Sequence, residues 1–212
     1  MSNLGWLDVS EIDFNALLLL EPLHVRYIAA RDPSEKMGTA LAAHPAVRWF
    51  LIQAYPPVKA YIEDCLAKAK EDPSAEEVRE AELAVLGSMH DWLIYVLDPT
   101  QYDQLEFLTW DDDSLLGMAD FSGKIVLGVG SGTGRLAFVV APEARAVYAV
   151  EPVANLRRYL WEKREQLGFD NVYPIDGTIE RIPLSANFAD ILMAGHVFGD
   201  DFEAEYLEMY RV

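Results

Sequence analysis

The stretch VLGVGSGTG, residues 126–134, constrains the fold of this chain most, because alternating glycines follow an apolar run there. Glycine adopts positive φ without strain, and its missing Cβ lets a ligand approach the backbone. A strand that ends in such a turn and leads into a helix presents backbone N–H groups to a ligand. The stretch therefore predicts a strand, a tight ligand-binding turn and a helix in succession.

The part of the chain from residue 123 onward alternates between strand-like and helix-like patterns. The segment 155–168 has the periodicity of an amphipathic helix, with Arg157 expected to point outward, and 202–212 reads as the start of another helix. Strands that alternate with helices indicate a parallel sheet with right-handed crossovers. Four apolar runs predict its strands: 124–129, 146–150, 171–175 and 189–195.

The part of the chain before residue 110 has helical periodicity instead. A helix is expected over residues 11–30, interrupted or bent near Pro22, and another over 58–69. Ser74 and Glu77 have the spacing of a capping box, which predicts a long helix that stops before Asp98. The predicted organisation is a helical domain at 1–109, an acidic linker at 110–122 and an α/β domain at 123–212.

Composition narrows the class of protein and its partners. The net charge of −18 disfavours nucleic acid and anionic membranes as partners, since an acidic surface repels phosphate. A single cysteine excludes an internal disulfide and fits a reducing cytoplasm. The apolar run 17–20 is too short for a signal peptide or a membrane span. Histidines 24, 44 and 90 are scattered, so no metal site is expected.

Two classes of adenosine ligand fit the glycine-rich turn. Gly130, Gly132 and Gly134 form the G-x-G-x-G pattern common in S-adenosylmethionine binders, whereas residues 132–137 also satisfy the dinucleotide pattern G-x-G-x-x-A. Glu151 ends the second predicted strand, where an acid can accept hydrogen bonds from ribose hydroxyls in either class. An acid before a helix can instead simply favour the helix dipole, so both interpretations of Glu151 stay open.

The segment 123–212 resembles the class I S-adenosylmethionine-dependent methyltransferases, closest to their type 11 group. The resemblance is carried by VGSGTGR, by the acid Glu151, by Gly177 with Ile182-Pro183-Leu184, and by Phe188-Ala189-Asp190. It implies a Rossmann-like parallel sheet of strand order 3-2-1-4, preceded by the helical domain. It also implies S-adenosylmethionine as cofactor and a small-molecule acceptor as partner.

The resemblance also implies roles for single residues. Glu151 would hold the ribose hydroxyls, Thr178 and Ile179 would flank the adenine, and Asp176 is an alternative adenine contact. His196 would lie near the transferred methyl group and is the candidate catalytic base, although a lone histidine is often structural. The implied cofactor-binding residues are Gly130, Ser131, Gly132, Gly134, Glu151, Pro152, Asp176, Thr178 and Ile179.

This sequence departs from the family pattern at two places. Gly128 stands where the family usually has an acid that orients the methionine end of the cofactor. The sequence also stops at Val212, where the family continues with further strands. The sheet is therefore expected to be incomplete: the chain is a truncated protein or a fragment, or another chain, such as a second copy in a homodimer, covers the open edge.

Three functions remain open at this point. The leading hypothesis is a methyltransferase that acts on a small molecule. The second is a catalytically inactive, methyltransferase-like binding or interaction protein or fragment, favoured by Gly128 and the missing strands. The third, a nicotinamide-dependent oxidoreductase, depends on the shifted glycine pattern and Glu151.

Overall fold

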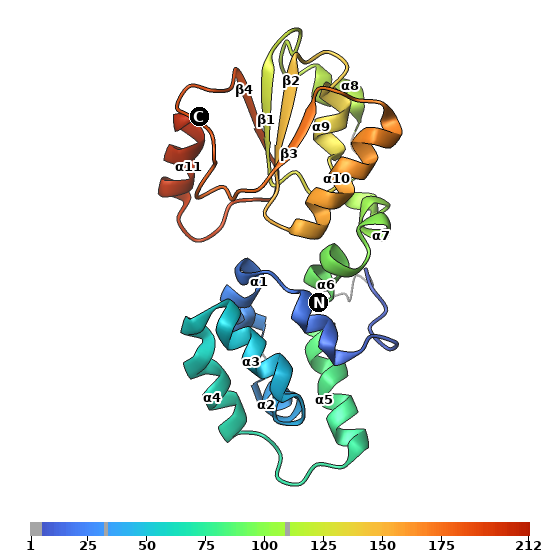
Figure 1. Cartoon of the computed structure of the whole chain (residues 1–212), viewed down its shortest axis with the longest axis vertical. Coiled ribbons are helices and arrows are strands. Elements are labelled where there is room, and N and C mark those ends of the chain that lie inside the picture. Colours follow the sequence, from blue (N-terminus) through green and yellow to red (C-terminus); the bar gives the residue numbers. More distant parts are fainter. Residues whose placement is uncertain (1–5, 32–33, 109–110) are drawn as a thin grey trace. The chain divides into compact units, whose positions relative to one another are not determined.

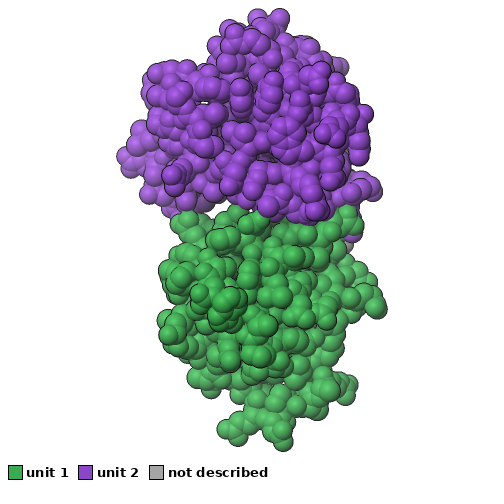
Figure 2. Space-filling model, viewed as in Figure 1, with its two compact units in different colours: residues 1–98 green, residues 99–212 purple. Residues whose placement is uncertain are grey.

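The computed structural model describes residues 6–31, 34–108 and 111–212. The chain divides into two compact units, residues 1–98 and residues 99–212 (Figure 1, Figure 2). The first unit is helical throughout its described residues, and the second contains a parallel sheet. An α/β fold that follows a helical region is therefore confirmed.

The first unit is built from short helices around a buried apolar core. Ser74 caps α5 by accepting from the backbone N of Glu77, and the Glu77 side chain accepts in return from the backbone N of Ser74, so the predicted capping box is confirmed. The helices are η1 (Phe14–Leu19), α1 (Pro22–Arg26), η2 (Ile28–Arg31), α2 (Ser34–Ala43), α3 (Pro45–Ala54), η3 (Pro56–Val58), α4 (Lys59–Ala67), α5 (Ala75–Ser88) and α6 (His90–Leu97).

One predicted helix of this unit is interrupted where expected, and another is wrong in extent. The helix expected over residues 11–30 is interrupted at Pro22, because proline can begin a helix but not continue one, and a second break at Tyr27 separates α1 from η2. The long helix after Ser74 is interrupted at Met89, which leaves helical geometry with φ −121° and separates α5 from α6. Periodicity alone misses such breaks because apolar residues continue on the same side of both segments.

The contact between α2 and α4 depends on a glycine. A Cβ added to Gly38 would overlap the backbone carbonyl of Cys65, so the two helices approach closely there. Cys65 is fully buried beside this contact. Only glycine allows this distance between the helix backbones, since any side chain would push the carbonyl away.

The second unit consists of a parallel sheet with helices before and between its strands. The strand order is β3-β2-β1-β4, as expected, and all three strand pairs are parallel. Helix α8 lies within the segment expected to be a linker. The elements are α7 (Pro99–Asp103), η4 (Glu106–Leu108), α8 (Asp112–Leu116), β1 (Ile125–Val129), α9 (Arg135–Val140), β2 (Ala146–Val150), α10 (Ala154–Leu167), β3 (Val172–Ile175), β4 (Ile191–Ala194) and α11 (Phe202–Arg211).

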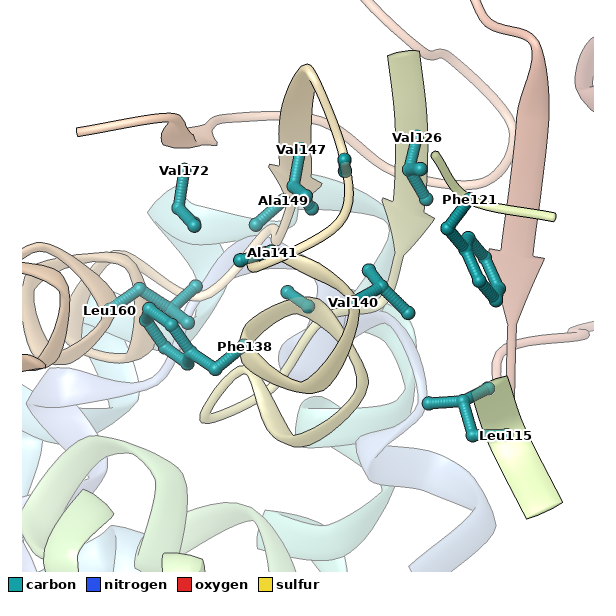
Figure 3. Packing of buried hydrophobic residues seen from close by; sticks show 12 residues of the cluster. Leu115, Phe121, Val126, Phe138, Val140, Ala141, Val147, Ala149, Leu160 and Val172 are labelled. Atoms are coloured by element: carbon teal, nitrogen blue, oxygen red, sulfur yellow. The ribbon is translucent and has the colours of Figure 1, made fainter. Parts of the chain in front are cut away.

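Each face of the sheet has its own core. On one face, the strand residues Val126, Val147 and Val172 pack against Phe138 of α9 and Leu160 of α10 (Figure 3). Alternate strand residues, among them Leu127, Val129 and Val150, belong to a second cluster with side chains from the segment after β3 and from the end of α11. Helix α11 lies on the side of the sheet away from α9 and α10 (Figure 1). Burial on both faces is typical of parallel strands and explains why β1 is nearly all apolar.

Strand β4 forms one edge of the sheet. It pairs with β1, and within the described ranges no strand pairs with its other side. The end of α11 lies against the segment before β4, because the carbonyls of Arg211 and Val212 accept from the backbone N of Asn187 and Ala189, both at 2.8 Å. The Arg211 guanidinium pairs with Glu208 and holds the pKa of that carboxyl below its usual range.

The Gly38 contact predicts opposite effects for two glycine substitutions in the helical unit. Gly38→Ala is expected to lower the free energy of unfolding by about 2–3 kcal/mol, because the new methyl group overlaps Cys65. Gly87→Ala in α5 is the matched control: its Cβ meets nothing within 4 Å, and it is expected to raise the free energy of unfolding by about 0.5–1 kcal/mol. Urea denaturation followed by circular dichroism measures both changes; equal effects of the two variants would contradict the close helix approach.

Candidate cofactor site

The predicted site residues follow the carboxyl ends of the four strands. Gly130, Ser131, Gly132 and Gly134 follow β1, whereas Glu151 and Pro152 follow β2. Asp176, Thr178 and Ile179 follow β3, and His196 follows β4. Because parallel strands all end at the same edge, these segments gather where ligands bind in open α/β sheets.

The glycine loop, residues 130–134, is held in a tight turn between β1 and α9. Gly130, Gly132 and Gly134 have φ values of +64°, +54° and +84°, which strain any residue other than glycine. The backbone N of Ser131 donates to the carbonyl of Val150 at 3.0 Å, and that of Gly134 donates to the carbonyl of Ser131 at 2.7 Å. The loop is therefore attached to the end of β2 as well as to β1.

Glu151 connects the glycine loop to the start of α10. Its Oε2 accepts from the backbone N of Gly132 at 2.7 Å, and its Oε1 accepts from the backbone N of Val153 at 2.9 Å. The side chain is only 4% exposed. Val153 is the N-cap residue of α10, so Oε1 of Glu151 binds the start of a helix, as the helix-dipole interpretation expects. The other oxygen orders the glycine loop.

Burial makes Glu151 an unusual acid. Loss of water around the carboxyl raises the pKa of Glu151 to about 7, although the amide hydrogen bonds from Val153 and Gly132 and the charge of Arg157 oppose the rise. A carboxyl with a pKa in this range changes charge near neutral pH, and anything that donates to it favours the charged form. The protonation of Glu151 therefore depends on what occupies the site.

Arg157 lies against the same turn, although the sequence pattern placed it on the outer side of the helix. Its Nη1 donates to the carbonyls of Glu151 and Pro152 at 2.8 and 2.7 Å and forms an ion pair with Asp176 at 2.9 Å. The side chain is 22% exposed. A long guanidinium can reach back over one helical turn, which periodicity cannot detect. Asp176 itself is exposed and is oriented by this arginine.

The Cβ positions of the three glycines face side chains of the same unit, and the expectation that their missing Cβ atoms leave room for a ligand stays a prediction. The Cβ position of Gly130 is occupied by Val197 from the segment after β4. That of Gly132 faces the ring of Tyr102, at 3.5 Å from Cε1, and that of Gly134 lies 2.6 Å from Leu160 and from Phe138. Side chains from three parts of the unit thus converge on the loop.

Gly128 lies in β1, where the family usually has an acid. A Cβ at this position would lie 3.0 Å from Oγ of Ser131, and that hydroxyl donates to the carbonyl of Gly128 at 3.1 Å. The space in which an acid at position 128 would begin is thus partly taken by Ser131. The departure from the family pattern is accommodated by a local polar contact.

The residues after β3 form a compact turn. Thr178 and Arg181 make a bridge in which each backbone N donates to the other's carbonyl. Ile179 is 8% exposed and belongs to the apolar cluster between the sheet and α11, so most of its surface contacts the core. Thr178 is half-buried. The adenine contacts assigned to these residues stay predictions.

His196 is exposed at the surface of the segment after β4. Its φ of +57° is in the left-handed region, which is strained for a residue with a Cβ. The next residue, Val197, is half-buried against Gly130. His196 thus directly precedes a residue that contacts the glycine loop, whereas its catalytic role stays a prediction.

Sequence reasoning missed two residues that contact this site, Tyr102 and Arg157. Tyr102 is 9% exposed and lies against Gly132, yet no pattern connects a tyrosine before the sheet with the turn after β1. Its neighbour Asp103 accepts from Tyr159 Oη at 3.0 Å and from Lys163 Nζ at 2.6 Å. Lys163 also donates to the carbonyl of Thr133 at 3.3 Å, so α7, α10 and the loop are linked.

A separate hollow is lined by residues of α8, α9 and α10. It has a volume of about 320 Å³, and none of the predicted site residues lines it. Its cations are Arg135, which pairs with Asp112, and Lys163, which pairs with Asp103. The lining residues are Asp112, Leu116, Arg135, Phe138, Val139, Pro142, Lys163, Leu167 and Phe169.

Within the described ranges, no three His, Cys, Asp or Glu side chains gather as they would around a metal ion. Among the same residues, no helix has both the length and the apolar character needed to cross a membrane.

Comparison with known proteins identifies the second unit. Residues 127–212 match the family described as "Methyltransferase domain". These residues form a class I S-adenosylmethionine-dependent methyltransferase domain. An uncharacterised methyltransferase of Geobacillus sp. (strain WCH70) is 32% identical to this chain over 87 residues, which is 41% of this chain and 39% of that protein. The chain thus spans about two fifths of the length of this curated relative.

Solved structures of methyltransferases are similar to about half of the chain or less. A crystal structure of an S-adenosylmethionine-dependent methyltransferase from Aquifex aeolicus is 26% identical, with a TM-score of 0.47 over 54% of this chain and 66% of that chain. The PRMT1 enzyme–prozyme complex of Trypanosoma brucei with AdoHcy is 31% identical, with a TM-score of 0.36 over 40% of this chain and 27% of that chain.

The packing around Gly134 predicts a large loss of stability for one substitution in the methyltransferase domain. Gly134→Ala combines positive φ with a Cβ 2.6 Å from Leu160 and Phe138, and is expected to cost about 3 kcal/mol. Gly123→Ala is the control: its φ is +69° but its Cβ meets nothing, so it is expected to cost only about 1 kcal/mol. Thermal unfolding compares the two; an equal loss would mean that the contacts with α9 and α10 do not constrain the loop.

Proposed function

We propose that this chain binds S-adenosylmethionine at the carboxyl edge of its sheet and transfers the methyl group to a small-molecule acceptor. The observation that carries the proposal is Glu151, a buried acid at the tip of β2 that also accepts from Gly132 of the glycine loop at 2.7 Å. The family of the domain supports the choice of S-adenosylmethionine over a nicotinamide dinucleotide.

The residues present fit this cofactor. A carboxylate offers about four acceptor positions, and two remain on Glu151 after the hydrogen bonds from Gly132 and Val153, enough for the two hydroxyls of a ribose. In the described part of the chain, Arg157 is the one basic group among those that shift the pKa of Glu151 most. A ligand without phosphate suits such a site, because it does not need several cations to bind it. Arg157 supports the turn by binding the carbonyls of Glu151 and Pro152.

The chain has a limited chemical task in this reaction. S-adenosylmethionine, when bound, supplies a methyl group that is already activated on a sulfonium. The protein must hold the acceptor in line with that group and exclude water. Val197 and Tyr102 would restrict the space around the glycine loop, and His196 is the proposed base for an acceptor that must lose a proton.

The nature of the acceptor and of any partner chain stays a proposal. A small molecule is proposed because the chain carries a net charge of −18, which is unfavourable for nucleic acid. A homodimer that covers the outer side of β4 also remains a prediction, since β4 pairs with β1 alone within the described ranges.

Calorimetric titration with S-adenosylhomocysteine tests the cofactor. Micromolar binding is expected, with none for NADH, and Glu151→Gln is expected to weaken it about tenfold or more because a charged acceptor of hydrogen bonds is lost. Glu143→Gln is the matched control, since Glu143 is an exposed acid of the same unit. Absence of binding in the unaltered protein would contradict the proposal and favour an interaction protein; binding of NADH alone would favour an oxidoreductase.

The pKa of Glu151 predicts that this affinity depends on pH. Hydroxyl donors favour the carboxylate, so the ligand lowers a pKa that is about 7 without it, and binding releases a proton. Affinity is therefore expected to rise as the pH increases through 7, by at most about tenfold per pH unit. Titration from about pH 6 to about pH 8 in buffers of different ionisation enthalpy measures the change and the proton released. In Glu151→Gln the pH dependence should disappear; an affinity that falls with rising pH would contradict this assignment.

A further inference from the structure

Helix α11 carries an acid on its inner side, in addition to the apolar Met209 near its end, and aromatic rings on its outer side. Glu205 is 1% exposed on its inner side, whereas Phe202, Tyr206 and Tyr210 are 62%, 52% and 79% exposed on its outer side. A buried carboxylate is costly unless hydrogen bonds compensate for the lost water. The position of Glu205 therefore requires a specific partner inside the unit.

That partner is the backbone of Gly199. The N–H of Gly199 donates to both oxygens of Glu205, at 3.0 Å each. A hydrogen bond to an ionised acceptor is stronger than one between neutral groups. Glu205 is therefore the anchor of the segment that joins β4 to α11.

The first five residues of this segment, 195–199, are called the post-β4 loop. Gly195 and Gly199 are its ends, so its backbone has few restrictions of its own. Between them His196 is held at φ +57°, a conformation that persists only where the surroundings impose it. Val197 fills the Cβ space of Gly130 in the glycine loop. The loop is thus held at one end by Glu205 and in its middle by Gly130.

We propose that Glu205 is a positioning residue of the cofactor site. By binding Gly199, it keeps the post-β4 loop against the glycine loop, which sets the position of Val197 and His196 before any ligand arrives. A loop that is already ordered does not have to be ordered on binding, so Glu205 increases the affinity for an adenosyl ligand. The effect on affinity rests on the proposed function, whereas the hold on the loop does not.

The test compares Glu205→Ala with Glu203→Ala. Glu203 is an exposed acid in the first turn of the same helix, so its variant controls for the lost charge. Amide hydrogen exchange, resolved by NMR, reports the protection of the Gly199 N–H, and calorimetry reports the affinity for S-adenosylhomocysteine. Glu205→Ala is expected to speed the exchange of Gly199 and to weaken binding about tenfold. Glu203→Ala should change neither.

Two further variants separate the positioning role from a general loss of stability. Glu205→Gln keeps one oxygen that can accept from Gly199, so it should restore part of the protection and of the affinity. Val197→Ala leaves Glu205 intact and removes the contact with Gly130, so it should weaken binding with little change in the exchange of Gly199. Both variants should unfold at temperatures close to that of the unaltered protein.

The outcomes distinguish this proposal from the proposed function. Unchanged exchange of Gly199 in Glu205→Ala overturns the positioning role whatever the ligand does. Faster exchange of Gly199 in Glu205→Ala, together with unchanged or higher affinity for S-adenosylhomocysteine, also overturns the positioning role. The ordered loop would then have no effect on ligand binding or would hinder it. If the unaltered protein binds no S-adenosylhomocysteine, the proposed function fails, and faster exchange in Glu205→Ala still supports the hold of Glu205 on the loop.

Discussion

The carboxyl group of Glu151 is the interaction on which the arrangement of the cofactor site depends. It accepts from Gly132 in the turn after β1 and from Val153 at the start of α10, so one buried side chain connects two adjacent strand-to-helix turns. Burial raises its pKa to about 7, because the charged carboxylate loses its hydration in the position where it connects the two turns. Such a cost is common where a group is prepared for a ligand.

The surroundings of the glycine loop complement this acid. Tyr102, Val197 and Leu160 come from three different elements and each lies against one glycine of the loop. A side chain at Gly130 or Gly134 would displace one of these neighbours, and a side chain at any of the three positions would strain a positive φ. The loop is therefore constrained on its outer side by packing and on its inner side by Glu151, which limits the reorganisation that ligand binding requires.

Parts of this arrangement could be predicted from local patterns. The four strands, their order 3-2-1-4 and the capping box of α5 follow from apolar runs, the family resemblance and the spacing of Ser74 and Glu77. The break at Met89 could not be predicted, because apolar periodicity continues across it, whereas Pro22 indicated the interruption of the segment 11–30. Arg157 and Tyr102 were missed for another reason: their contacts join residues that no periodic pattern relates.

The sequence by itself determined the class of fold and the place of the site, because an apolar run, a glycine-rich turn and an acid after the next strand are local features with a local physical cause. Only the tertiary structure decided what the glycines accommodate and which acid holds the post-β4 loop. Glu205 is indistinguishable in sequence from its exposed neighbour Glu203, and it becomes distinct only when α11 packs with that side inward. Burial and partner are properties of the packed chain, since they depend on residues brought together from distant segments.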